Sequence, residues 1–197
     1  MASPFGMWED RTSRLIYHDA MWALLSGIGR TGSVADLGGA NGLSRNWFTN
    51  VTTVDLDAEQ GPDVVADLMD YEGEHDLVLL RYVLHYMPDA QVRRLFQRLA
   101  RWHRGSVLVV QFVNDDLPAK QRNSVGEERW FRSEPQLLAL LTGWQVQQRL
   151  RLEYEVDPQF YRNLLGHPNP TAHQEAVVSL LLERREPTNN EVHNAGH

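Results

Sequence analysis

The chain has no cysteine, a single lysine and no long apolar run in its 197 residues. The absence of cysteine excludes disulfides, thiolate metal ligands and thiol catalysis. The longest apolar runs, 77–80 and 107–110, fit buried strands and fall far short of the ~20 residues that span a bilayer. The N-terminus has neither the basic region nor the apolar core of a secretory signal. A cytoplasmic protein without a membrane partner is therefore expected.

Positive charge is also scarce, since the net charge is −7. A protein that holds a nucleic-acid backbone needs a basic surface, so no nucleic-acid partner is expected. The length and the 42% hydrophobic content fit one globular domain. We expect that domain over 1–186, with a helical lid over about 1–30 and a flexible tail over 187–197.

Helical and strand patterns alternate along the chain, beginning with an amphipathic helix over 10–29. Expected strands cover 34–37, 51–55, 63–66, 76–80, 106–113, 144–156 and 176–182. Helices are expected from Leu43, from Pro88 to Gly105, and from Ser133 to Leu141. The pattern predicts an α/β fold of the Rossmann-like, doubly wound type, with a mostly parallel seven-stranded sheet, an antiparallel C-terminal hairpin and helices on both faces.

A glycine-rich turn, Gly38-Gly39-Ala40-Asn41-Gly42, follows the first expected strand, and Asp36 stands at the end of that strand. Backbone N–H groups in such a turn can approach an anionic group of a ligand. A carboxylate beside them would repel a pyrophosphate and attract an ammonium. The turn therefore fits a ligand that carries both a carboxylate and an ammonium.

Two further acids follow the second and third strands. Asp55 can accept hydrogen bonds from both hydroxyls of a ribose. Asp67 can accept from the exocyclic amine of adenine, while Leu68 covers the ring; a surface or capping role for Asp67 is the alternative. An amino acid, a ribose and an adenine together describe S-adenosylmethionine (SAM).

Over roughly residues 10–185 the chain resembles the class I SAM-dependent methyltransferases. Residues 36–42 are similar to the family's first motif, with Ala40 in place of its middle glycine. Residues 76–88 are similar to its fourth-strand motif. Residues 130–133 and 137–144 are similar to its late helix and strand. The resemblance implies that Asp36, Gly38 and Gly42 bind the methionyl part, Asp55 the ribose and Asp67 the adenine. The further expected cofactor-binding residues are Gly39, Leu56, Leu68 and Arg81.

Residues after the fourth strand border the methionine and the substrate in that family. Tyr82 and His85 lie within one helical turn of each other and are the candidate catalytic pair, although a lone histidine is more often structural. The candidate substrate contacts are Tyr17, Tyr86, Gln111 and Asn114. No His-Glu-x-x-His or other metal-ligand spacing occurs, so no metal is expected.

The expected reaction is methyl transfer from SAM to an O, N or C nucleophile of a small molecule, such as a secondary metabolite, with S-adenosylhomocysteine as product. The prediction allows a homodimer. One alternative is a SAM-binding protein that does not transfer the methyl group. A nicotinamide-dependent oxidoreductase fits less well: its Gly-x-Gly-x-x-Gly turn is absent, and Asp116 precedes Lys120 where a short-chain dehydrogenase would have a tyrosine.

Overall fold

The computed structural model describes the central part of the chain. The described residues are 32–40, 42–113, 120–122, 128–156 and 173–185. The expected lid (1–30), the tail (187–197) and the candidate substrate contacts Tyr17 and Asn114 lie outside them.

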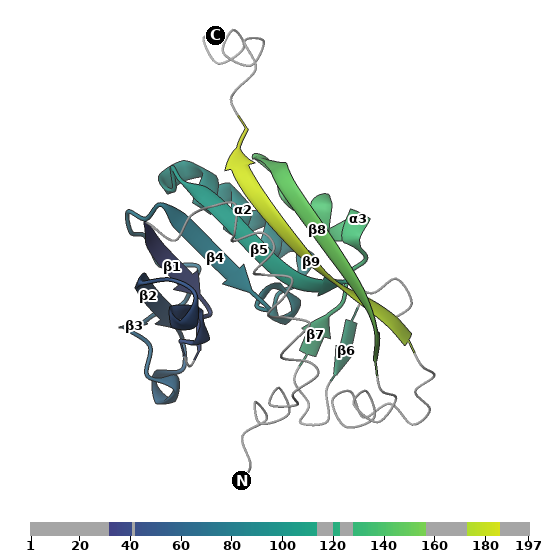
Figure 1. Cartoon of the computed structure of the whole chain (residues 1–197), viewed down its shortest axis with the longest axis horizontal. Coiled ribbons are helices and arrows are strands. Elements are labelled where there is room, and N and C mark those ends of the chain that lie inside the picture. The colour runs from purple at the N-terminus through teal and green to yellow at the C-terminus, as the bar shows by residue number, and fades with distance from the viewer. Residues whose placement is uncertain (1–31, 41, 114–119, 123–127, 157–172, 186–197) are drawn as a thin grey trace, which may run out of the picture.

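A seven-stranded mixed sheet organises the molecule (Figure 1), with the strand order β3-β2-β1-β4-β5-β9-β8. Its strands are β1 (Ser33–Leu37), β2 (Asn50–Asp55), β3 (Val64–Val65), β4 (Leu77–Arg81), β5 (Ser106–Val113), β8 (Trp144–Val156) and β9 (His173–Arg184). The first five are parallel, and β9 pairs antiparallel with both β5 and β8. The predicted fold class is confirmed, and the parallel strands all end at one margin of the sheet.

The centre of the sheet is buried on both faces. In β5, Val107 and Val109 belong to one core cluster, while Leu108 and Val110 belong to the other. A strand covered on both sides gains stability from apolar residues at every position, not at alternate ones. This explains why β4 and β5 appear in the sequence as continuous apolar runs.

Helix α2 (Asp89–Trp102) covers one face, and Pro88 is its N-cap residue. Its buried side chains, Val92, Leu95, Phe96 and Leu99, form the expected stripe and join the cluster that contains Val107. The helix ends at Trp102 and not at Gly105 as expected. Gly105 has a different role: a Cβ there would lie 2.0 Å from the carbonyl oxygen of Asp76, so this position requires glycine for close packing.

Two expected helices are shorter than the sequence predicts. The segment from Leu43 forms a single 3-10 turn, η2 (Leu43–Asn46), because β2 already begins at Asn50. Helix α3 (Glu134–Leu138) begins with a capping box. It does not extend to Leu141, because Leu141 N–H bonds to Leu138 three residues back, which tightens the chain into a turn.

The edge strand β8 contains a β-bulge between Val146 and Gln148. The bulge interrupts the alternation of apolar residues at Gln148. It also reverses the face of the sheet on which the side chains of the following residues lie. Trp144 packs in the cluster with α2, whereas Leu150 and Leu152 pack against the opposite cluster. One strand thus contributes to both cores.

Short elements complete the margin at which the parallel strands end. These are η3 (Ala58–Gln60), η4 (Leu84–Tyr86) and an antiparallel hairpin of β6 (Lys120–Arg122) and β7 (Glu128–Trp130). The sequence patterns did not predict the hairpin. None of the helices in the described ranges is long and apolar enough to cross a membrane.

Candidate active site

The glycine turn lies directly against neighbouring backbone. Gly38 (φ 76°) and Gly39 donate to the carbonyl of Val54 at 2.8 and 3.2 Å, and Gly42 (φ 70°) precedes η2. A Cβ on Gly38 would lie 2.7 Å from Cγ2 of Val83. The turn therefore needs glycine both for its left-handed backbone and for its contact with the segment after β4.

Asp36 lies beneath this turn with no solvent-accessible surface. Its Oδ2 accepts a hydrogen bond from Ser44 Oγ, while its Oδ1 has no partner among the described residues. Burial raises the pKa of Asp36 above its ordinary value, although the charge of Arg81 and the Ser44 bond oppose that shift. A buried carboxylate with an unused oxygen is stabilised by a positive group placed beside it.

Asp55 closes the other side of the turn. Its Oδ2 accepts from the backbone N–H of Ala40 at 2.9 Å, and its Oδ1 accepts from Asp57 N–H at 2.9 Å. Ala40, which replaces the family's glycine, keeps a left-handed backbone with φ 41°. Since a carboxylate has roughly four acceptor positions, Asp55 retains capacity for a ligand's hydroxyls. Leu56 beside it is 72% exposed.

Asp67 has a local structural role in the described part of the chain. Its Oδ1 accepts from Met69 N–H at 2.8 Å, and its carbonyl accepts from the N–H groups of Asp70 and Tyr71. Leu68 is partly buried against the core cluster of α2. The contacts match the capping alternative for Asp67, and adenine binding by these two residues stays a prediction.

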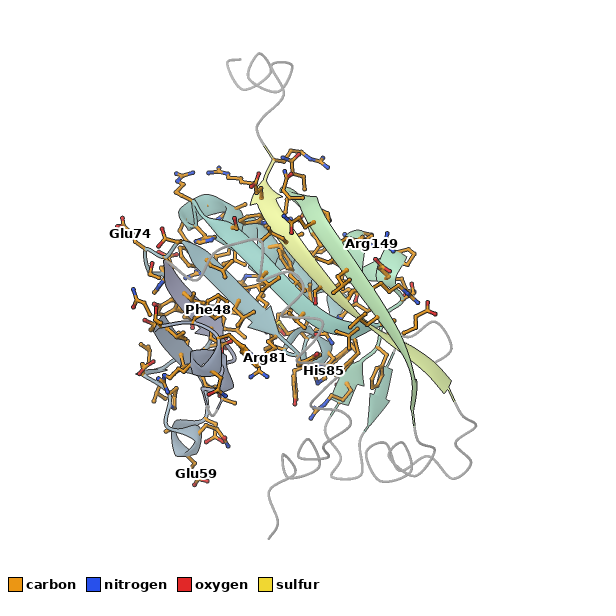
Figure 2. All side chains as sticks on the ribbon, viewed as in Figure 1. Phe48, Glu59, Glu74, Arg81, His85 and Arg149 are labelled. Atoms are coloured by element: carbon orange, nitrogen blue, oxygen red, sulfur yellow. The ribbon has the colours of Figure 1, made fainter. Side chains whose placement is uncertain are left out.

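Arg81 ends β4 near the glycine turn. Its guanidinium carbon lies 5.8 Å from the ring centre of Trp47, and its Nε has no hydrogen-bond partner within the described ranges. Figure 2 shows Arg81 and His85 at the same margin of the sheet, where β4 ends. The positive charge of Arg81 also acts on Asp36 beneath the glycine turn.

Tyr82 and His85, the candidate catalytic pair, contact the same ring. The ring centres of Tyr82 and His85 lie 5.3 and 4.7 Å from that of Phe112 in β5. Tyr82 adopts a left-handed backbone (φ 52°), and its N–H donates to the carbonyl of Val110 at 2.8 Å. The structure brings the pair together through a residue that the sequence patterns did not single out.

His85 is 4% exposed and contacts Gln111, another candidate residue. Gln111 Nε2 lies 3.3 Å from His85 Nδ1, and the ring of Tyr86 lies 4.1 Å from the imidazole centre. Burial, followed by the charges of Arg129 and Arg132, lowers the pKa of His85 well below its ordinary value, although the Gln111 bond opposes the shift. The imidazole is therefore uncharged at neutral pH.

Arg132 is a buried residue that the sequence analysis missed. Its guanidinium donates to the carbonyls of Leu84 at 2.9 Å and Met87 at 2.5 Å, and to Asp89 Oδ1 at 2.8 Å. It thereby fixes the η4 turn, which carries His85, to the start of α2. Residue 132 lies in a motif that resembles the family's late region, but no spacing signal marked its partners.

The hairpin contacts the same turn through Arg129. The guanidinium carbon of Arg129 lies 3.8 Å from the ring centre of Tyr86, which is 38% exposed. Tyr86 is thus the most accessible of the described aromatic candidates. No group of three or more His, Asp or Glu side chains able to hold a metal occurs in the described part of the chain.

Solved structures define the class of this fold. The 1,6-didemethyltoxoflavin N1-methyltransferase of Burkholderia thailandensis, with bound 1,6-didemethyltoxoflavin and S-adenosylhomocysteine, matches with a TM-score of 0.62 at 21% identity over 91% of this chain and 84% of that chain. The N-methyltransferase NodS of Bradyrhizobium japonicum, in complex with S-adenosylhomocysteine, matches with a TM-score of 0.62 at 11% identity over 94% of both chains.

A protein of Pyrococcus horikoshii assigned as an RNA methyltransferase matches with a TM-score of 0.56 at 15% identity, over 91% of this chain and 89% of that chain. No family model matches the chain, and no curated protein matches it in sequence. The chain therefore has the class I SAM-dependent methyltransferase fold, as its motifs predicted. The same fold includes proteins named for small molecules and for RNA.

Proposed function

We propose that the protein is an enzyme that binds SAM and transfers its methyl group to an O, N or C nucleophile of a small molecule. The observation that carries the proposal is the unused, buried oxygen of Asp36 beneath the glycine turn. An ammonium placed there would satisfy that oxygen and compensate a buried negative charge. A pyrophosphate would meet repulsion at the same place.

In this proposal each part of SAM contacts a separate group of residues. Asp36, Gly38, Gly39, Gly42 and Arg81 hold the methionyl part, with the acid facing its ammonium. Arg81 supports this placement because its Nε is unpartnered in the described ranges and its charge acts on Asp36. A guanidinium there suits the methionyl carboxylate.

The nucleoside lies beyond the turn in this proposal. Asp55 binds the ribose hydroxyls with the acceptor capacity that its two backbone bonds leave free. The exposed Leu56 packs on the nucleoside, and Asp67 and Leu68 border the adenine. When bound, SAM supplies an activated methyl group on a sulfonium.

The acceptor binds beside η4 and the end of β5, where Tyr82, His85, Tyr86 and Gln111 converge. In-line displacement needs alignment of the nucleophile with the methyl group, so these side chains act by positioning the acceptor. The acidic net charge supports a small molecule over RNA. A cytoplasmic location and a homodimer stay predictions.

Calorimetric titration with SAM, S-adenosylhomocysteine and NAD tests the cofactor. We expect both adenosyl ligands to bind and NAD not to bind; binding of NAD alone would refute the proposal. Asp55→Ala should weaken SAM binding by roughly 1.5–3 kcal/mol, the range of hydrogen bonds to charged groups.

Asp57→Ala is the matched control for the Asp55 variant. Asp57 also carries a negative charge, but its Oδ1 accepts from Glu59 N–H at 2.9 Å and caps η3. Its removal should change SAM affinity much less. Equal losses in both variants would mean that the ribose lies elsewhere.

Methyl transfer itself is tested with methyl-labelled SAM and a metabolite extract of the host. Label should appear in a small molecule and S-adenosylhomocysteine should accumulate. Conversion of an acceptor without label transfer would instead identify a protein that uses SAM for other chemistry.

A further inference from the structure

The contact between Gln111 and His85 determines which imidazole nitrogen carries the hydrogen. An amide nitrogen has no lone pair to offer, so Gln111 Nε2, 3.3 Å from His85 Nδ1, can only donate to it. With the amide of Gln111 in this orientation, Nδ1 of the uncharged ring is the acceptor. The hydrogen is then on Nε2.

The surroundings of Gln111 support this orientation of its amide. Gln111 Nε2 also lies 3.5 Å from the carbonyl oxygen of Phe112, a group that can only accept. The reverse orientation would bring the amide oxygen toward that carbonyl oxygen, and two oxygens without a hydrogen between them repel. Gln111 is 4% exposed, so water cannot readily screen that repulsion.

We propose that His85 contacts the methyl acceptor as a neutral hydrogen-bond donor through Nε2–H, and not as a general base. The proposal rests on the proposed function and extends it to a substrate class. The acceptor molecule carries an oxygen or ring nitrogen with a free lone pair beside its nucleophilic atom. His85 Nε2–H holds that lone pair and so orients the nucleophile.

The charges around His85 fit a donor better than a base. Among the residues that the structure describes, the charges of Arg129 on β7 and of Arg132 after it act on the ring, and both disfavour its protonation. Asp89 pairs with Arg132 at 2.8 Å and so offsets part of the Arg132 charge, while Arg129 is the larger of the two electrostatic causes. A base must become an imidazolium during the reaction, which this burial and these charges oppose.

Nitrogen NMR of the histidine-labelled protein tests the tautomer without any substrate. The His85 signals, assigned by their loss in His85→Gln, should show an Nε2–H ring that stays uncharged as the pH falls below the ordinary histidine pKa of about 6.5. His103 is the internal reference, because its Nε2 lies 2.8 Å from the carbonyl oxygen of Ser106, which can only accept. An Nδ1–H ring at His85, or titration near the ordinary pKa, overturns the proposal.

Gln111→Leu removes the donor that selects the tautomer. The His85 ring should then populate both neutral tautomers, while the His103 signals stay unchanged. If His85 kept a pure Nε2–H ring in this variant, Gln111 would not be its positioning residue. The wild-type spectrum tests the tautomer even if the variant fails to fold.

The role of His85 in the reaction is tested with the methyl acceptor that the label-transfer experiment identifies. A Gln side chain can place an N–H near the position of Nε2, whereas Leu cannot. We expect kcat/KM of His85→Gln to exceed that of His85→Leu by about tenfold or more, the fold-change of one buried hydrogen bond. If both variants lost kcat/KM equally, and the wild-type rate fell at acid pH with the pKa of a histidine, His85 would instead be a general base.

The two proposals fail in different measurements. If SAM does not bind, or no methyl label moves, the proposed function fails while the tautomer of His85 is still measured. If SAM binds and label moves but the ring carries hydrogen on Nδ1, the donor role alone fails.

Discussion

Asp36→Asn separates the charge of Asp36 from its shape. Asn keeps an oxygen that can accept from Ser44, but it removes the negative charge that we expect to face the SAM ammonium. Loss of a charge-assisted hydrogen bond is worth about 1.5–3 kcal/mol, which corresponds to about tenfold to 150-fold weaker SAM binding. Binding of methylthioadenosine, which lacks the amino-acid part, should change little.

The pH dependence of SAM affinity is a second test of the role of Asp36. Burial raises the pKa of its carboxyl, and the proposed contact with the SAM ammonium requires the ionised form. Affinity of the wild type should therefore weaken as pH falls from about 7 toward the raised pKa, a range in which an α-ammonium with a pKa of about 8 stays protonated. Asp36→Asn should bind SAM with little change over the same range.

Protein stability should follow the same linkage with a definite sign. A carboxyl whose folded pKa is raised contributes stability below its unfolded pKa and loses it as pH rises through the folded pKa. As the pH rises through this range, the wild type should therefore lose stability relative to Asp36→Asn. Urea unfolding of both proteins at several pH values would measure this difference in the free energy of unfolding. If SAM and methylthioadenosine lost the same factor in the variant, Asp36 would not face the ammonium.

Two pairs of substitutions test the framework around the site by urea unfolding. Gly105→Ala should lower the free energy of unfolding by about 3 kcal/mol or more, because its Cβ would lie 2.0 Å from a backbone carbonyl oxygen. Gly61→Ala is the control: its φ is 67° and nothing lies within 4 Å of its Cβ, so it should cost about 1–2 kcal/mol. Similar costs in the two variants would refute the close-contact argument. Arg132→Met should cost about 2–4 kcal/mol because it removes the buried donors to the carbonyls of Leu84 and Met87. Asp89→Asn should cost under about 1 kcal/mol because the Asp89 side chain is 61% exposed. The reverse order would mean that the ion pair, not the carbonyl bonds, holds η4.

The sequence by itself determined the parts of the fold whose signals are local. The continuous apolar runs of β4 and β5 follow from burial on two faces, and the stripe of α2 follows from burial on one. The order of glycine turn and acids, Asp36 and then Asp55, placed a candidate cofactor site at the strand ends because parallel strands end at one margin. Local signals were weaker at boundaries: α3 and η2 end early because neighbouring elements tighten or redirect the chain.

The tertiary structure alone decided what the site residues contact. Gln111 and His85 are neighbours because β5 ends beside η4, and no spacing in the sequence encodes that meeting. Arg132 reaches η4 for the same reason, because this contact depends on packing between segments that are distant in the chain. Ser44 is close to Asp36 in the chain, but their contact depends on how the glycine turn folds back over β1. The hydrogen on His85 Nε2 is therefore a property of the folded protein, whereas the acid at the end of β1 could be recognised in the sequence.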